Sequence, residues 1–452
     1  MTSSSSSSSP SVSANVRYLK SLDAVRQRSA SVYALGQQGR LQHFTLDETK
    51  IVDVAEFVIS LITRDHGTID SVPTHGRWRS YCVTIDNQQR DLISEHVAQW
   101  RATDVSQWEC ARRIIDLFVV SVLIDAGAGS QWKYQDKQLG ILTRTEGLGM
   151  AALRMFESGV FSSSPTNKFQ ADAPALIKLV DQQLLDGFQV SEENPLLGGS
   201  NRAELLRRLG MALNQQNRYF GGKCACKTHP PRPGFMLDYL AGCAKTPETV
   251  GIDDLWEVII EGFAPVWPAS RTQLDGVSLG DVWPCSVLNT NTNDQNNSSG
   301  DALVPFHKLS QWLTWSLLEV IVRLGGFTVK DTHKLTGLPE YRNGGLFVDM
   351  QVLKLDEKDQ IRGLAHPQAK KVPLFDGSDP VIVEWRALTV ALLDKVAEII
   401  KQKCCALGDV PDMFLGRVLE GGTWKAGREM AAELRSDTKD PPINIVSDGT
   451  LF

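Results

Sequence analysis

The sequence predicts a mainly α-helical protein. Apolar residues recur with helical spacing in many segments, and alternating strand patterns are few and short. The composition of the 452 residues, 42% hydrophobic and 22% charged, is ordinary for a globular chain. We therefore expect one large helical fold with two lobes and a few short strands.

The first expected helix covers about 46–64. Carboxylates stand at its start, where the helix dipole favours negative charge. Five apolar residues then share one face, which predicts a helix packed on a core: Ile51, Val54, Ala55, Val58 and Ile62. The same reasoning predicts helices over about 90–103, 108–125, 144–158, 173–186, 201–216, 252–263, 304–325, 380–404 and 411–435. Leu346–Leu355 is the most ambiguous segment.

The segment from Arg112 to Asp125 is apolar on nearly every side, which predicts a core helix closed by Asp125. A carboxylate at a helix C-terminus faces the negative end of the dipole, at a cost of roughly 0.3–1 kcal/mol. Asp125 therefore needs a compensating partner or a raised pKa, which would suit acid–base chemistry. The alternative is a carboxylate that caps nearby loop amides.

In the helix that starts near Pro305, the residues Gln311, Trp315 and Glu319 are spaced to share one face, with Lys308 beside them. An aromatic ring with Lys and Gln beside it is suited to stacking a planar group and holding an anion. Amphipathic packing with a surface Glu319–Arg323 pair explains the same pattern.

Two stretches, 338–349 and 384–394, place carboxylates and an arginine inside otherwise apolar helical sequence. A charge buried without a partner costs several kcal/mol, so such groups pair, shift their pKa or touch a ligand. The stretches therefore indicate a polar pocket in a helical core. An internal salt-bridge network that fixes register is the alternative for the second stretch. The candidates are Glu340, Tyr341, Arg342, Asp349, Glu384 and Arg386.

Gly344 and Gly345 follow Asn343 and remove side chains at the expected start of a helix, where backbone amides bind anions. A plain turn is the alternative. Two aromatic and basic clusters in loop-like surroundings either line a pocket or pack loops onto the core: His75 with Arg77 and Trp78, and Trp132 with Tyr134.

Composition limits the partners. A net charge of -6 disfavours binding to nucleic acid or to anionic membranes. The sequence contains no run of 18 apolar residues, so no membrane span is predicted. The eight cysteines lack framework spacing, which favours reduced thiols in a cytoplasmic protein. Cys224 and Cys226 with His229 lack a second ligand pair for zinc, and no nucleotide or zincin motif occurs. We expect no metal and no cofactor.

Residues 1–14 are expected to form a disordered serine-rich tail without signal-peptide character. The Gly-, Pro- and Lys-rich segment Gly221–Gly234 is expected to connect an N-terminal helical lobe, 15–220, with a C-terminal lobe, 234–452. The second lobe carries most candidate residues, and the two would form one integrated catalytic domain. A homodimer is left open.

Nine segments together resemble the uracil catabolism protein 4 family: HGRW (75–78), SVLIDAGAG (121–129), TEGLGMAALRMFESGVFSS (145–163), LGDVWP (279–284), VPFHKLSQWLTWSL (304–317), GLPEYRNGGLFVD (337–349), VEWRALTVALLD (383–394), GGTWKAGRE (421–429) and SDGTLF (447–452). They span almost the entire chain after the serine tail. The resemblance implies a place in a pyrimidine-degrading route that opens the ring of a uridine nucleotide and releases urea.

The order of three of these segments is also similar to the queuosine-nucleotide N-glycosidase family. That likeness implies an α-helical fold resembling helix-hairpin-helix DNA glycosylases, and a nucleoside 5′-monophosphate substrate. Lys308, Gln311, Tyr341, Arg342 and Arg386 fall on its motif residues. Departures are an acidic residue replaced by Ser316, an Asp replaced by Glu340, and Val-Pro replaced by Asn343-Gly344.

We therefore hypothesise an N-glycosidase that splits a ring-opened uridine nucleotide, ribosylurea 5′-phosphate, into urea and ribose 5-phosphate. Glu340 is the expected catalytic carboxylate, with Asp349 and Asp125 in reserve. Phosphate would be held by Lys308, Arg342 and the two glycine amides. The planar ureide would be stacked by an aromatic residue (Trp315, Tyr341 or Trp132) and bound at its edges by Gln311 and Glu384.

Two other classes of function fit less well. A non-catalytic partner protein of the same pathway would show a flat aromatic patch around residues 75–78 in place of an enclosed pocket. An amidohydrolase acting on a ureido acid would need a nucleophile or metal cluster, and the sequence contains none that we recognise.

Overall fold

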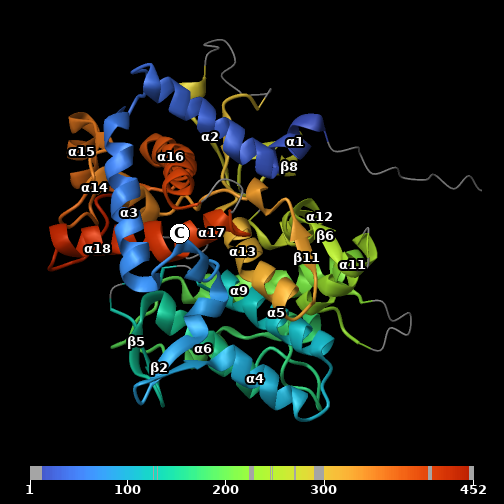
Figure 1. The fold of residues 1–452 in the computed structure, drawn as a ribbon. Coiled ribbons are helices and arrows are strands. Elements are labelled where there is room, and N and C mark those ends of the chain that lie inside the picture. The colour runs from blue at the N-terminus through green and yellow to red at the C-terminus, as the bar shows by residue number, and fades with distance from the viewer. Residues whose placement is uncertain are drawn as a thin grey trace, which may run out of the picture.

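The computed structural model describes residues 13–125, 127–129, 131–222, 229–244, 246, 248–268, 271–289, 300–405 and 410–446. It is mainly helical, which confirms the predicted fold class, and its strands form short two-stranded sheets (Figure 1). The likeness to helix-hairpin-helix glycosylases stays a prediction. Within the described part of the chain, no helix combines the length and apolar character needed to cross a bilayer.

One group of helices surrounds α16 (Pro380–Cys404), which begins with an Asp379 cap and a proline in its first turn. The N-terminal helices α2 (Leu22–Gln37) and α3 (Ile51–His66) pack directly against α16, so segments far apart in the sequence lie side by side (Figure 1). Near them lie α14 (Tyr341–Asp349), α17 (Phe414–Val418) and α18 (Trp424–Leu434).

A second group contains α4 (Leu92–Arg101), α5 (Gln107–Leu123), α6 (Arg144–Ser158) and α9 (Gly199–Gln215). Ser106 caps α5 by accepting a hydrogen bond from the Glu109 amide, and the helix then buries an almost continuous apolar surface. The helix α13 (Lys308–Arg323) packs on α5 and lies between the two groups (Figure 1).

The remaining helices are short: α1 (Ala14–Leu19), α7 (Ala173–Lys178), α8 (Asp181–Gly187), α10 (Asn217–Phe220), α11 (Met236–Cys243), α12 (Ile252–Glu257) and α15 (Glu357–Leu364). Two five-residue π-helical turns, Val258–Gly262 and Leu419–Thr423, extend α12 and join α17 to α18.

The antiparallel strand pairs are β1 (Phe44–Leu46) with β12 (Leu353–Leu355), β2 (Cys82–Ile85) with β3 (Gln88–Asp91), β4 (Lys133–Asp136) with β5 (Gly140–Thr143), β7 (Gln273–Leu274) with β8 (Val277–Ser278), and β9 (Val282–Pro284) with β10 (Leu303–Pro305). The parallel pairs are β6 (Thr249–Gly251) with β11 (Thr328–Lys330), and β13 (Leu374–Asp376) with β14 (Asn444–Val446). Several pairs join distant parts of the chain, as Phe44 opposite Leu355 does.

A single large hydrophobic cluster runs from Leu22 to Ile443 and draws side chains from both sides of the 221–234 segment. The segment therefore does not coincide with a break in the core. The two-lobe division at 15–220 and 234–452 stays a prediction, while the packing shows residues 22–66 beside the C-terminal helix α16.

The structure corrects several expected element boundaries. The helix predicted over 173–186 is two helices, because Leu179 leaves helical geometry with ψ 123. The helix predicted over 411–435 is interrupted by the π turn Leu419–Thr423. The ambiguous segment Leu346–Leu355 contains the end of α14 and then strand β12. The helix α2 is an element that the sequence reasoning missed.

Candidate functional site

Glu340 stands immediately before α14 in extended geometry and caps that helix. Its carboxylate accepts hydrogen bonds from the backbone amides of Arg342 at 2.6 Å and Asn343 at 2.5 Å. Burial raises the pKa of the Glu340 carboxyl, although the two amides and the nearby cation Lys308 act in the opposite direction. The first turn of α14 therefore fixes the orientation of the Glu340 carboxylate.

Lys308 is the first residue of α13, after His307 in left-handed geometry with φ 45. The Lys308 amide donates to Asp281 Oδ2 at 2.9 Å. Burial lowers the pKa of its ammonium group, while the charges of Glu340 and Asp125 favour the protonated form. Among the described residues, no hydrogen bond or ion pair of its Nζ is found, so the ammonium group is available to a ligand.

Asp125 follows the end of α5, and its carboxylate forms an ion pair with Arg77. Burial raises its pKa, and Oδ1 is buried without a hydrogen-bond partner among the described residues. Asp125 thus has a compensating cation, and burial raises the pKa of its carboxyl as well. Arg202, which the sequence reasoning missed, supports the same loop by donating to the carbonyls of Ile124 at 2.9 Å and Gly127 at 3.0 Å.

Tyr341 and Arg342 extend the group along the first turn of α14. The Arg342 guanidinium lies 5.2 Å from the centre of the Tyr341 ring. Burial raises the pKa of the Tyr341 hydroxyl, and the Glu340 charge acts in the same direction. The Arg342 side chain is held by a hydrogen bond from Nη1 to the Lys439 carbonyl at 3.0 Å.

These side chains combine deep burial with remaining contact to solvent. Lys308, Glu340 and Tyr341 are each half-buried, yet desolvation is the largest influence on the pKa of every one. The arrangement thus gathers two carboxyls, an ammonium group and a phenol in one place.

Asp281 and Arg386 form a buried clamp behind Lys308. The Arg386 guanidinium donates to Asp281 Oδ1 at 2.9 Å and Oδ2 at 2.8 Å, and its Nε donates to the carbonyl of Pro339 at 3.3 Å. Arg386, predicted to bind substrate, therefore links Asp281 to Pro339 and supports the segments that carry Lys308 and Glu340. Asp281 was missed, although it lies in the segment LGDVWP.

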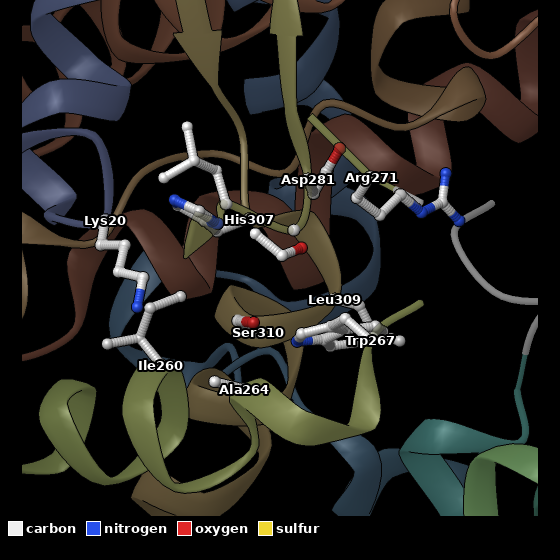
Figure 2. Close-up of a pocket in the computed structure, with 12 residues that line it drawn as sticks. Lys20, Ile260, Ala264, Trp267, Arg271, Asp281, His307, Leu309 and Ser310 are labelled. Carbon is white, nitrogen blue, oxygen red and sulfur yellow. The ribbon is translucent and has the colours of Figure 1, made fainter. Parts of the chain in front are cut away.

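A small cavity, partly open to solvent, lies against the first turn of α13 (Figure 2). Its lining includes Lys20, Trp267, Asp281, His307 and Ser310. None of Lys308, Glu340 and Tyr341 lines it. Since Lys308 and Ser310 are two residues apart, they lie on opposite sides of α13. Asp281 therefore lines the cavity and also accepts the Lys308 amide, while the carboxylate cluster, made up of Glu340, Asp125, Lys308 and Tyr341, is a separate place.

Three predicted site residues are fully engaged in structural bonds. The Gln311 amide bonds to the Phe306 carbonyl and to both the amide and hydroxyl of Thr336. Glu384 accepts from the backbone amides of residues 42, 43 and 44 at 2.9 to 3.2 Å. Asp349 forms a two-pronged ion pair with Arg435 at 2.9 and 2.5 Å. The structure does not bring these three side chains to the cluster.

The glycines predicted to bind an anion serve close packing instead. A Cβ added to Gly344 would lie 2.8 Å from Trp385, and one added to Gly345 would lie 2.9 Å from Pro442. The Gly344 amide is also bonded to the Glu340 carbonyl at 2.9 Å within the helix. The amides at the helix start are occupied by the Glu340 carboxylate, so no anion nest is open there.

The aromatic candidates other than Tyr341 are buried in packing. Trp315 is 1% exposed and its ring meets the backbone of Gly416. Trp132 donates to the Phe188 carbonyl at 2.9 Å and stacks with Tyr134 at 6.3 Å between ring centres. The Trp315 ring and the Trp132–Tyr134 pair are thus engaged in packing contacts.

Within the HGRW segment, Arg77 contacts the carboxylate cluster through its ion pair with Asp125. His75 bonds to a different carboxylate. His75 bonds through Nδ1 to Glu420 Oε2 at 2.6 Å, and its ring centre lies 4.6 Å from that of Trp312. The Arg77 guanidinium lies 5.7 Å from the same Trp312 ring. His75 therefore has the packing role that was the alternative to lining a pocket.

Cys224 and Cys226 fall outside the described residues. Among the residues that are described, no group of three or more His, Cys, Asp or Glu side chains has the arrangement of a metal site.

Comparisons with known proteins identify relatives over nearly the full chain. A family model described as a protein of unknown function (DUF1688) matches residues 18–452. A protein named Uracil catabolism protein 4, from Lachancea kluyveri, is 40% identical over 452 residues, covering 97% of this chain and 99% of that protein. Protein urg3 of Schizosaccharomyces pombe is 38% identical over 438 residues, with the same coverage of 97% and 99%. The resemblance to the uracil catabolism protein 4 family is thereby confirmed, and the chain belongs to the DUF1688 family.

Proposed function

We propose that the protein is an N-glycosidase of uracil catabolism that hydrolyses ribosylurea 5′-phosphate to urea and ribose 5-phosphate. The observation that carries this proposal is the half-buried Glu340 carboxylate, whose pKa is raised, near the unpaired ammonium group of Lys308. The name of the Lachancea relative supports the pathway. The similarity of its motifs to the queuosine-nucleotide N-glycosidases supports the reaction type.

In the proposed reaction the bond between the sugar C1′ and the ureide nitrogen breaks, and the electron pair leaves with nitrogen. Positive charge then develops on the sugar, and the Glu340 carboxylate stabilises it at short range. Glu340 also takes a proton from the water molecule that attacks C1′. Such a well-placed group typically contributes about 3–4 kcal/mol to transition-state stabilisation.

The leaving nitrogen needs a proton to depart as urea. We assign this proton to Asp125, because burial raises the pKa of its carboxyl and Oδ1 carries no other hydrogen bond among the described residues. Lys308 lies within electrostatic reach of both acids and lowers the pKa of each. The proposed reaction requires Glu340 to be ionised and Asp125 to be protonated. Tyr341 is the remaining aromatic candidate for stacking the planar ureide.

A direct assay tests the reaction. Purified protein is incubated with ribosylurea 5′-phosphate, ribosylurea or uridine monophosphate, while urea and ribose 5-phosphate are quantified. We expect release of both products from the first substrate and none from uridine monophosphate, whose ring is closed. Binding of ribosylurea 5′-phosphate without product release would instead support a non-catalytic partner protein.

Two carboxylates near α14 provide matched variants. Glu340→Gln keeps the side-chain shape and one cap acceptor but removes the charge, so turnover should fall by about two to three orders of magnitude. Asp349→Asn alters a carboxylate that is bound to Arg435 at the other end of the helix, and turnover per folded molecule should stay within a few-fold. Near-wild-type turnover of Glu340→Gln would refute the assignment.

A further inference from the structure

Arg342 is a buried cation with unused hydrogen-bond donors. The residue is 6% exposed, and Nη1 donates to the Lys439 carbonyl at 3.0 Å. Among the described residues, neither Nε nor Nη2 has a hydrogen-bond partner, and no carboxylate forms an ion pair with this guanidinium. Burial lowers its pKa accordingly. A buried guanidinium without an anion is costly and therefore favours binding one.

The helix α18 brings a second arginine close to the first. A Cβ added to Gly427 would lie 2.1 Å from the Arg342 carbonyl oxygen, so α18 and α14 touch through their backbones here. The next residue, Arg428, extends to α6 and donates from Nη1 to Glu146 Oε1 at 3.0 Å. Two segments singled out in the sequence, 145–163 and 421–429, thus meet beside Arg342.

Arg144 supplies a third guanidinium at the same place. It is the first residue of α6, two positions before Glu146, and it is exposed. Its φ of 52 places it in the left-handed region, which is unfavourable for an arginine and is retained where surrounding structure requires it. No hydrogen bond or ion pair of its side chain is found among the described residues, yet its charge acts on both Tyr341 and Arg342.

We propose that Arg342, Arg144 and Arg428 form a seat for the phosphate monoester of the substrate, with Arg342 at its base and the other two at its rim. Guanidinium groups offer planar pairs of donors that match phosphate oxygens. Glu146 holds Arg428 in position and is the one carboxylate bonded to this group in the described structure. The inference rests on the proposed function, because it names how that substrate is selected.

The seat also orients the substrate. In the chain, Tyr341 stands between Glu340 and Arg342, and the Arg342 guanidinium lies against the Tyr341 ring. A phosphate bound by the arginines would direct the 5′ end of the ribose toward α18. The C1′ atom and its ureide would then point toward Glu340 and Lys308, where the reaction requires them.

The kinetic test compares a phosphorylated with an unphosphorylated substrate. Arg144→Gln and Arg428→Gln should each raise KM for ribosylurea 5′-phosphate by roughly tenfold, the effect of losing one charge-assisted hydrogen bond. Their kcat/KM for ribosylurea should stay within twofold. Arg144→Lys, which keeps the charge, should recover part of the loss. The matched control is Arg208→Gln, an arginine paired with Glu204 on α9, which should change neither substrate's kinetics.

A binding measurement separates this inference from the proposed function. Calorimetry with ribose 5-phosphate and with ribose needs no turnover. The wild-type protein should bind the phosphate ester at least tenfold more tightly, and Arg144→Gln should remove most of that difference. If this holds while no substrate is hydrolysed, the seat stands and the glycosidase proposal fails. If hydrolysis occurs but phosphate adds no affinity, or the rim variants leave KM unchanged, the seat is overturned.

Discussion

The charge state of Glu340 depends on its neighbours, which gives the proposed reaction a defined pH dependence. Burial raises the pKa of this carboxyl above its ordinary value, so activity should fall as the pH drops through that raised pKa. Lys308 lowers the pKa of Glu340. Lys308→Met should therefore shift the acidic limb of the kcat/KM profile to higher pH.

The control for this shift is Lys334→Met, which removes a cation paired with Asp253 outside the carboxylate cluster. Its profile should coincide with that of the wild-type protein. An unshifted acidic limb in Lys308→Met would show that the titrating group does not sense this ammonium group.

At the scale of single residues, the sequence singled out charged side chains that stand in apolar helical segments. Glu340 and Asp125 stood out because a carboxylate in apolar helical sequence needs an explanation. Glu384 stood out for the same reason, but its partners are backbone amides, which have no signature in the sequence. Asp281 was missed because its partner Arg386 is 105 positions away.

The contact between α14 and α18 gives a prediction at the scale of elements. Gly427→Ala would place a methyl group 2.1 Å from the carbonyl oxygen of Arg342. Because a backbone atom cannot move aside cheaply, we expect a loss of about 1–3 kcal/mol in the free energy of unfolding. Gly242→Ala on α11 is the control, since an added Cβ there meets no described atom within 4 Å beyond its chain neighbours and its own helix backbone, and it should be neutral or stabilising by about 0.5–1 kcal/mol. Urea denaturation measures both, and equal stabilities would contradict the packing described here.

The clamp between Asp281 and Arg386 joins the start of α13 to α16. Asp281→Asn leaves a buried guanidinium without its anion and should lower the free energy of unfolding by about 3–5 kcal/mol. Asp53→Asn, in an exposed pair with Lys50, should cost about 0–1 kcal/mol.

The clamp also has a pH signature. Burial alone would raise the pKa of Asp281, but the pairing with Arg386 holds it below its ordinary value. The stabilisation is therefore present above the unfolded-state pKa of about 4 and is lost as the pH falls below it. The difference in stability between the wild-type protein and Asp281→Asn should narrow in acid, as denaturation at a series of pH values will measure. A constant difference would argue against an ionised Asp281.

At the element scale, helical periodicity found the long helices and misjudged their interruptions. The π turn Leu419–Thr423 lies where Gly422 packs on α3 and Gly421 packs on Val72 beyond the end of that helix, with added Cβ atoms 2.4 Å from Val58 and 2.8 Å from Val72. Such close contacts are tertiary and leave no local period to detect. The helix α2 did have local signals, a Ser21 cap and apolar residues three to four positions apart.

For the whole molecule, the shared core predicts that the two halves of the chain depend on each other. Helices α2 and α3 pack on α16, more than 300 positions later in the chain. A fragment ending at residue 222 would expose those faces and should lack cooperative unfolding and near-ultraviolet circular dichroism. A fragment that melts cooperatively would instead support the N-terminal lobe over 15–220.

The sequence predicted the helical class from composition and periodicity, but could not predict which helices meet. The pairing of β1 with β12 and the packing of α2 on α16 join segments with no common local pattern. Family resemblance located the motifs without indicating that Arg428 would contact Glu146. Long-range geometry of this kind is set by the packing of the whole core.

The anchoring of Glu340 has a consequence for selectivity. Both oxygens of its carboxylate are tied to main-chain amides, so the acid cannot swing to follow a sugar that binds out of place. A substrate with an epimeric pentose or an acylated urea would not fit the fixed Glu340 carboxylate and should be hydrolysed slowly. In the proposed reaction, the first turn of α14 would therefore restrict which substrates are hydrolysed.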